Sequence, residues 1–179
     1  MDPTSRGDAL HKVIGRSPMN ANALFVWLAV TTFVATASPA FSQQGPPPSE
    51  RAKQVEVLVT NAATLIDNRG KAAFEDFRKI DSGWFHGDTY LFVYDMNANV
   101  LLNPAFPKRE GTNVSGEKDA KGKLFHNEII KTAETKGSGW VDYMFPKPGQ
   151  TEPSQKWTFV KKVTIDGTPG LVASGFYPE

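Results

Sequence analysis

The side chains best suited to chemistry are a tyrosine and a lysine on two neighbouring segments with strand-like patterns. Tyr143 lies in the aromatic run 140–145, and Lys156 begins the next predicted strand. Side chains alternate between the two faces of a strand, so Tyr143 shares a face with Phe145, and Lys156 shares one with Thr158. A lysine and a tyrosine hydroxyl can hold a carboxylate, by charge and by a directed hydrogen bond. The alternative is that Lys156 is a solvated lysine at a strand edge.

Residues for catalysis or metal binding are scarce. The chain has no cysteine, and it lacks the spacings of a nucleophile elbow, a zinc protease and a phosphate-binding loop. Beyond residue 42 it has two histidines, His86 and His126, each with an acidic residue two positions later. A metal site needs three or four converging ligands. We therefore expect solvated histidines, no metal, no cofactor and no enzymatic activity.

The N-terminus has the pattern of a secretory signal peptide. Arg16 precedes the uncharged, largely apolar stretch 23–35, and small residues follow it. This stretch is short for a spanning helix of about 20 residues, so we expect a leader over 1–42, cleaved between Ala37 and Ser42. An uncleaved signal anchor is the alternative. Residues 43–48 read as a proline-rich linker, and 49–179 as the domain.

The charge balance argues against nucleic acid as a partner. The whole chain has 20 basic and 19 acidic residues. The predicted leader holds three of the basic and two of the acidic residues, which leaves 17 of each. A nearly neutral exported domain without disulfides fits a bacterial periplasm.

The apolar residues predict an α+β fold. A period near 3.6 predicts helices over 49–68, 71–80 and 123–136. The first helix would have Ser49 as its N-cap and would stop near Gly70. A period of two predicts strands over 90–94, 100–103, 139–145, 156–165 and 171–177. Because the connections are short, we expect an antiparallel sheet of about five strands with helices packed on it.

The connection over 104–122 is longer than most loops in compact domains. Loops of this length are more often functional than incidental, and we expect it to form a lid or a pocket wall.

In its order of motifs the chain resembles a single Cache domain. The residues that carry the resemblance are the run Tyr90 to Asp95, Asn103-Pro104, Gly111-Thr112-Asn113, Gly137-x-Gly139-Trp140-Val141-x-Tyr143-x-Phe145 and Pro153-x-x-Lys156. The resemblance implies an extracytoplasmic sensor with a PAS-like antiparallel sheet and a long N-terminal helix. It also implies a pocket over the sheet for a small organic ligand, in this family often a short carboxylate.

The resemblance also implies the pocket residues. The family's positions fall on Tyr143, Phe145, Lys156, Tyr94 and Asn103. This family often has His-Pro where the chain has Asn103-Pro104, which would change the hydrogen bonding there.

Two tryptophans are further candidates for the pocket. Trp84 and Trp157 could line it, although large aromatic residues mostly serve cores.

The predicted function is that of a non-enzymatic periplasmic sensor domain that binds a small organic acid. Members of the family are usually followed by a transmembrane helix and an output module, whereas this sequence stops at Glu179. We therefore expect it to act in signal transduction through a membrane-bound partner. The long N-terminal helix favours a homodimer. The alternative is a structural or protein-association module of the cell envelope whose own aromatic residues fill the pocket.

Overall fold

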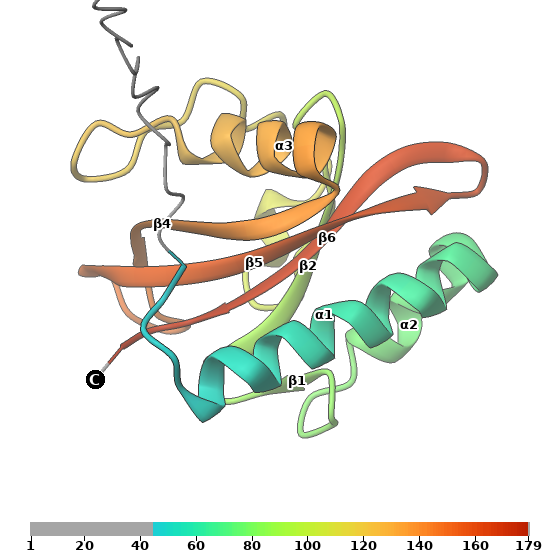
Figure 1. Cartoon of the computed structure of the whole chain (residues 1–179), viewed down its shortest axis with the longest axis horizontal. Helices are drawn as coiled ribbons and strands as arrows, with labels where there is room; N and C mark the ends of the chain where they lie inside the picture. Colours follow the sequence, from blue (N-terminus) through green and yellow to red (C-terminus); the bar gives the residue numbers. More distant parts are fainter. Residues whose placement is uncertain (1–44, 179) are drawn as a thin grey trace, which may run out of the picture. The chain divides into compact units, whose positions relative to one another are not determined.

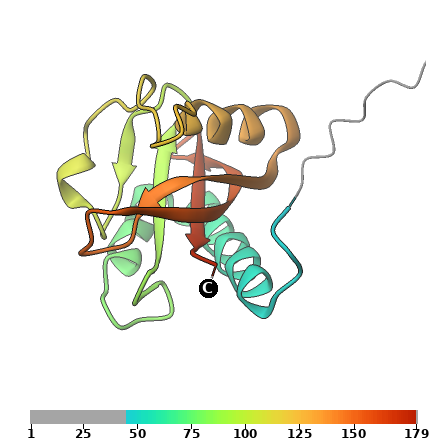
Figure 2. The same cartoon turned by 90° about the vertical axis from the view of Figure 1, so that its left-hand side faces the viewer.

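The computed structural model describes residues 45–178, and the predicted leader lies outside this range. In this part of the chain, six antiparallel strands form one sheet between helices (Figures 1 and 2). The helical segments are α1 (Glu50–Arg69), η1 (Gly70–Ala73), α2 (Phe74–Phe77), η2 (Pro107–Arg109) and α3 (Phe125–Lys136). The strands are β1 (Phe85–His86), β2 (Thr89–Asp95), β3 (Val100–Leu102), β4 (Ser138–Pro146), β5 (Pro153–Ile165) and β6 (Thr168–Phe176). The predicted α+β class is confirmed.

The sheet has one strand more than expected. Its order is β1-β2-β6-β5-β4, and β3 pairs with β2. The additional strand is β1, which is two residues long and pairs with Tyr90 and Thr89 of β2. A pair this short has no alternation of apolar and polar residues to reveal it in the sequence.

Helix α1 begins and ends where the sequence indicated. The hydroxyl of Ser49 caps its first turn by accepting a hydrogen bond of 3.1 Å from the backbone N–H of Ala52. Gly70 follows the helix with a φ of 55°. A Cβ at this glycine would lie 1.6 Å from Oδ1 of Asp166, so the close approach to that loop requires glycine.

The second helix, predicted over 71–80, ends three residues earlier than expected. η1 and α2 follow each other without a break, and the helical segment ends at Phe77. Phe74 and Phe77 are buried, but Ile80 is 70% exposed. Because Ile80 has nothing to pack against, the helix does not extend to it.

The helices cover opposite faces of the sheet and define two cores. Helix α1 contacts β5 and β6, whereas α3 contacts β4 and β5 from the other side (Figure 1). The core under α1 includes Val59, Ile66, Leu91 and Val93. The residues of the second core lie under α3 and the 103–124 segment; they include Tyr90, Phe92, Tyr94, Phe125, Ile129, Tyr143, Phe145 and Val160. The alternation of β2 thus sends its aromatic residues to one face and its aliphatic residues to the other.

Segment 103–124 folds back beside β3 and does not extend into solvent. The backbone N–H of Gly111 donates to the carbonyl of Val100 at 2.8 Å, and that of Val100 donates to the carbonyl of Thr112 at 3.0 Å. These bonds hold the segment against the sheet, where Phe106 packs on the second core. The segment therefore forms a wall over this face.

Candidate ligand-binding site

Lys156 lies in the interior of the domain. Strand β5 pairs with β4 so that Lys156 stands opposite Tyr143, on the face covered by α3. The lysine is 1% exposed, which rules out the solvated strand-edge alternative. Its Nζ donates a hydrogen bond of 2.8 Å to the hydroxyl of Tyr90.

Aromatic rings surround the buried ammonium group. Its Nζ lies 4.3 Å from the ring centroid of Tyr90, 5.2 Å from that of Tyr177, 5.5 Å from that of Phe145 and 5.7 Å from that of Phe92. Ring faces attract a cation, but they do not neutralise it.

No carboxylate among residues 45–178 forms an ion pair with Lys156. Asp88 acts on it only at longer range, and its carboxylate pairs with Arg51 at 2.6 Å. Burial lowers the pKa of Lys156 from 10.5 to about 7. An anion brought to Nζ would stabilise the charged form, because a nearby opposite charge raises the pKa of a lysine.

Tyr143 supplies a hydroxyl on the same face. Its oxygen lies 2.9 Å from Oγ1 of Thr158, and either group can be the donor. Burial raises the pKa of Tyr143 well above its ordinary value, so the phenol stays neutral. The ring stacks on Phe125 at a centroid distance of 4.3 Å, which links the site to α3.

The structure brings four of the six predicted residues together on one face. Tyr94 and Phe145 are buried in the same core as Tyr143, and Lys156 contacts the Phe145 ring. Asn103 is 3% exposed, and its side-chain oxygen accepts a hydrogen bond of 3.1 Å from the backbone N–H of Phe106. Its amide group therefore holds the start of the 103–124 segment.

Trp84 lies elsewhere. It packs against the core under α1, with its ring 5.0 Å from that of Phe77. Trp157 also belongs to that core. Both tryptophans are on the face of the sheet opposite Lys156.

A second charged cluster borders the same aromatic core, and the sequence analysis missed it. Nη1 of Arg109 lies 3.2 Å from Oε1 of Glu117, and Nη2 of Arg109 lies 3.2 Å from Nε2 of His126. The arginine stands over the ring of Phe145, with 5.7 Å from Cζ to the centroid.

His126 corrects an expectation from the sequence. It is 2% exposed and not solvated, and burial lowers its pKa to about 4. The neighbouring Phe125 and Ile129 indicated the buried side of this helix, but the polarity of His126 concealed its place there. Among residues 45–178, no three histidine, aspartate or glutamate side chains are grouped so as to hold a metal ion.

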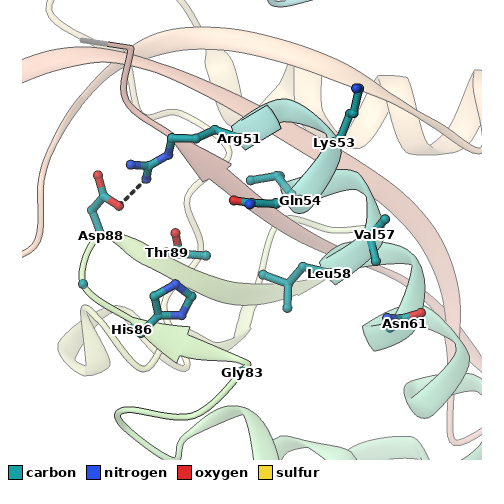
Figure 3. Close-up of a pocket in the computed structure, with 12 residues that line it drawn as sticks. Arg51, Lys53, Gln54, Val57, Leu58, Asn61, Gly83, His86, Asp88 and Thr89 are labelled. Atoms are coloured by element: carbon teal, nitrogen blue, oxygen red, sulfur yellow. Dashed lines mark hydrogen bonds and ion pairs between the residues drawn. The ribbon is translucent and has the colours of Figure 1, made fainter. Parts of the chain in front are cut away.

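A separate groove lies on the opposite side of the sheet, between α1 and the turn after β1. It has a volume of about 940 Å³, and Arg51 and Asp88 pair across one end of it (Figure 3). Val57, Leu58 and His86 also line it. None of the residues predicted for ligand binding lies in this groove.

The described part of the chain is thus an antiparallel six-stranded sheet covered by α1 on one face and by α3 on the other. The chain belongs to the Cache domain family, whose match covers residues 62–167. This confirms the resemblance seen in the sequence.

Two curated relatives are signalling proteins. The methyl-accepting chemotaxis protein McpP of Pseudomonas putida is 30% identical over 92 residues, which are 51% of this chain and 16% of that protein. The sensor histidine kinase MctS of Rhizobium johnstonii is 30% identical over 164 residues, covering 84% of this chain and 35% of that protein. The chain thus spans about a third or less of the length of these relatives.

Solved structures share the fold. A periplasmic sensor domain of a chemotaxis protein is 31% identical with a TM-score of 0.61, covering 72% of this chain and 95% of that chain. A Cache chemosensory domain, solved for its recognition of carboxylic acids, is 24% identical with a TM-score of 0.61, covering 72% of this chain and 93% of that chain. In chemoreceptors and sensor kinases, Cache domains lie outside the cytoplasm. Within residues 45–178 we find no helix with the length and apolarity needed to span a bilayer.

Proposed function

We propose that this domain is a periplasmic, non-enzymatic sensor that binds a short carboxylate at Lys156. The observation that carries the proposal is the fully buried ammonium group without an ion-pair partner among residues 45–178. A buried charge is costly unless it is paired, and the partner that would pair the Lys156 ammonium group is an anion. A carboxylate would accept hydrogen bonds from Nζ and from a neighbouring tyrosine hydroxyl.

The surroundings of Lys156 suit a small ligand with a short apolar part. Phe145, Phe92 and the tyrosine rings give an apolar surface, and the hydroxyls of Tyr90 and Tyr143 give directed donors. Lys156 has almost no contact with water in this conformation, so entry requires the 103–124 wall or its neighbours to move.

Family membership supports the signalling part of the proposal. The relatives are parts of a chemoreceptor and a sensor kinase, so we propose that the occupied domain acts through a membrane-bound partner. For this coupling the partner must bind the occupied domain more tightly than the empty domain, typically by about 1 to 3 kcal/mol. The N-terminal leader would place the domain in the periplasm.

The alternative of a protein-association module is supported by the groove beside α1. It is large, and the half-exposed Val57 at its edge is an apolar residue without a covering partner in residues 45–178. This groove lies on the face opposite Lys156, so the two functions can be tested separately.

Thermal unfolding of the full-length chain with acetate, propionate, butyrate and succinate tests the carboxylate proposal. A ligand at 100 times its dissociation constant adds about 2.7 kcal/mol of stability, which shifts the melting temperature by several degrees. Lys156→Met should abolish this shift, and Lys162→Met, on the exposed part of the same strand, should keep it. If no acid shifts the wild-type chain, or if Lys156→Met responds as the wild type does, the carboxylate site is not at Lys156.

A further inference from the structure

Two buried nitrogen atoms that border the same aromatic core as Lys156 have no hydrogen-bond partner among residues 45–178. They are Nε of Arg109 and Nδ1 of His126. More than about 90% of buried polar atoms in proteins are paired, so an unpaired one needs an explanation. Here the two unpaired atoms belong to side chains that contact each other: Nη2 of Arg109 lies 3.2 Å from Nε2 of His126.

These atoms belong to the same interior as Lys156. The Arg109 guanidinium and the Lys156 ammonium lie 5.7 Å and 5.5 Å from the centroid of one ring, that of Phe145. The His126 ring lies 5.4 Å from that of Tyr94. The charge of Arg109 also opposes the rise in the pKa that burial causes at Tyr94 and Tyr143.

Nε of Arg109 is a donor. Nε2 of His126 lies 3.2 Å from Nη2 of Arg109 and 3.3 Å from Oε2 of Glu117, so the tautomer of the ring decides which of the two it bonds. The histidine is neutral near pH 7, because burial lowers its pKa to about 4. We assign its proton to Nδ1, because Glu117 is already paired with Arg109 and an arginine nitrogen can only donate to Nε2. With this tautomer the pair presents two N–H groups without acceptors among residues 45–178.

The charges at the site select an uncharged acceptor. Arg109 is already paired with Glu117, and Lys156 would be paired by the ligand carboxylate of the proposed function. A second anionic group on the ligand would then have no cation of its own. A hydroxyl or carbonyl oxygen satisfies the N–H donors and adds no charge.

We propose that Arg109 and His126 form a second contact point, and that the ligand is a short carboxylate with an uncharged acceptor oxygen, a hydroxyl or a carbonyl. This inference rests on the proposed function, which places the carboxylate at Lys156. Arg109 and His126 set specificity, and Lys156 supplies the charge that holds the acid.

Matched acids that differ by one oxygen test the proposal. Calorimetry on the full-length chain compares propionate with lactate and with pyruvate, and butyrate with 3-hydroxybutyrate; succinate serves as the dianion. In at least one pair the oxygenated acid should bind about tenfold more tightly, as expected for a hydrogen bond to an otherwise unpaired buried donor.

Conservative variants assign the effect to the two side chains. Arg109→Lys keeps the charge beside Glu117 but lacks Nε, and His126→Gln keeps a polar group near Nε2 but lacks the Nδ1 donor. Each variant should reduce the preference for the oxygenated acid over the plain acid to about threefold or less. Its affinity for the plain acid should stay within about twofold of the wild-type value. His126→Asn, whose amide can stand near Nδ1, should restore part of the preference. Lys108→Gln, an exposed neighbour of Arg109, should retain all of it.

The outcomes separate this inference from the proposed function. If plain acids bind through Lys156 but no pair shows a preference, the second contact point is refuted and the carboxylate site stands. The inference is equally overturned if succinate binds most tightly, or if the preference survives in both Arg109→Lys and His126→Gln. If the wild-type chain binds none of the acids, the proposed function itself fails.

Discussion

The ammonium group of Lys156 lies 2.8 Å from the hydroxyl of Tyr90, and this neutral phenol is its hydrogen-bond acceptor. The pKa of Tyr90 is raised well above its ordinary value, chiefly by burial, so it does not ionise to become the counter-ion. Below about pH 7, where Lys156 is protonated, the domain therefore holds a cation in its interior at a cost in stability. Such a cost is common where a folded protein retains a group for binding.

Replacing Lys156 with methionine should stabilise the empty domain while abolishing the binding of acids. Methionine has a similar length and no charge, so it removes the desolvation cost and leaves little cavity. We expect the free energy of unfolding at pH 7 to rise by about 1 to 4 kcal/mol in urea denaturation. A clear loss of stability would show that Lys156 contributes to the fold and is not retained for a ligand.

The stability of the empty domain should increase with pH above about pH 7. The pKa of Lys156 is about 7 in the folded state and 10.5 without the protein's influence, so the unfolded chain binds more protons between these values. The cost of burying the cation is fully present below pH 7 and is relieved as the pH rises toward 10.5. Of the groups near Nζ, the Tyr90 and Tyr177 phenols are neutral here and Asp88 is paired with Arg51. In urea denaturation at several pH values, Lys156→Met should remove this increase of the unfolding free energy with pH.

Binding of an acid should take up a proton above pH 7. The carboxylate favours the charged form of Lys156, so the affinity should fall by up to tenfold per pH unit between about pH 7.5 and 9. Calorimetry in two buffers of different ionisation enthalpy measures the number of protons that are taken up on binding. An affinity that does not change over this range would mean that Lys156 is already charged in the empty domain.

Removal of the Tyr143 hydroxyl should weaken the binding of acids by about 0.5 to 1.5 kcal/mol, the usual net contribution of one hydrogen bond. Tyr143→Phe also leaves Oγ1 of Thr158 without its partner at 2.9 Å. The double variant Tyr143→Phe/Thr158→Val removes both groups, so it should recover some of the stability lost in the single variant. Thermal unfolding of the two variants measures the effect on folding, and calorimetry measures the effect on binding. Equal affinity of Tyr143→Phe and the wild type for the acid would place the carboxylate away from Tyr143.

Gly70→Ala should destabilise the domain more than Gly111→Ala. Both glycines have positive φ, 55° and 78°, which costs about 1 kcal/mol for alanine. Only at Gly70 would the new Cβ also meet another group, Oδ1 of Asp166 at 1.6 Å. The double variant Gly70→Ala/Asp166→Ala should regain the additional unfolding free energy that Gly70→Ala loses relative to Gly111→Ala. Equal unfolding free energies of the two single variants would show that the approach to Asp166 is unimportant.

Most predictions that relied on local patterns agree with the structure. The apolar spacing located α1, with Ser49 as its cap and Gly70 at its end, because capping and amphipathicity depend on neighbours in sequence. Alternation grouped Tyr143 with Phe145 and Lys156 with Thr158, because the period of a strand is independent of what covers it. The pairing of β4 with β5 then brings Tyr143 opposite Lys156. The second helix was predicted too long, since Ile80 fits the pattern but has no surface to bury it.

The second contact point could not be predicted in this way. Arg109 and His126 are 17 positions apart, and they meet because the 103–124 segment folds back over the sheet. An arginine in a polar loop and a histidine in the first turn of a helix look solvated when only their neighbours in sequence are considered.

The sequence by itself determined the α+β class and which residues of a strand share a face, because these follow from periodicity and from residues close in the chain. The order of its motifs indicated the family. Only the tertiary structure decided that Lys156 is buried and without an ion-pair partner among the described residues, that Trp84 lies on the other face, and that Arg109 and His126 border the same core. Burial and charge pairing depend on which distant segments close over a residue, and local patterns do not encode that closure.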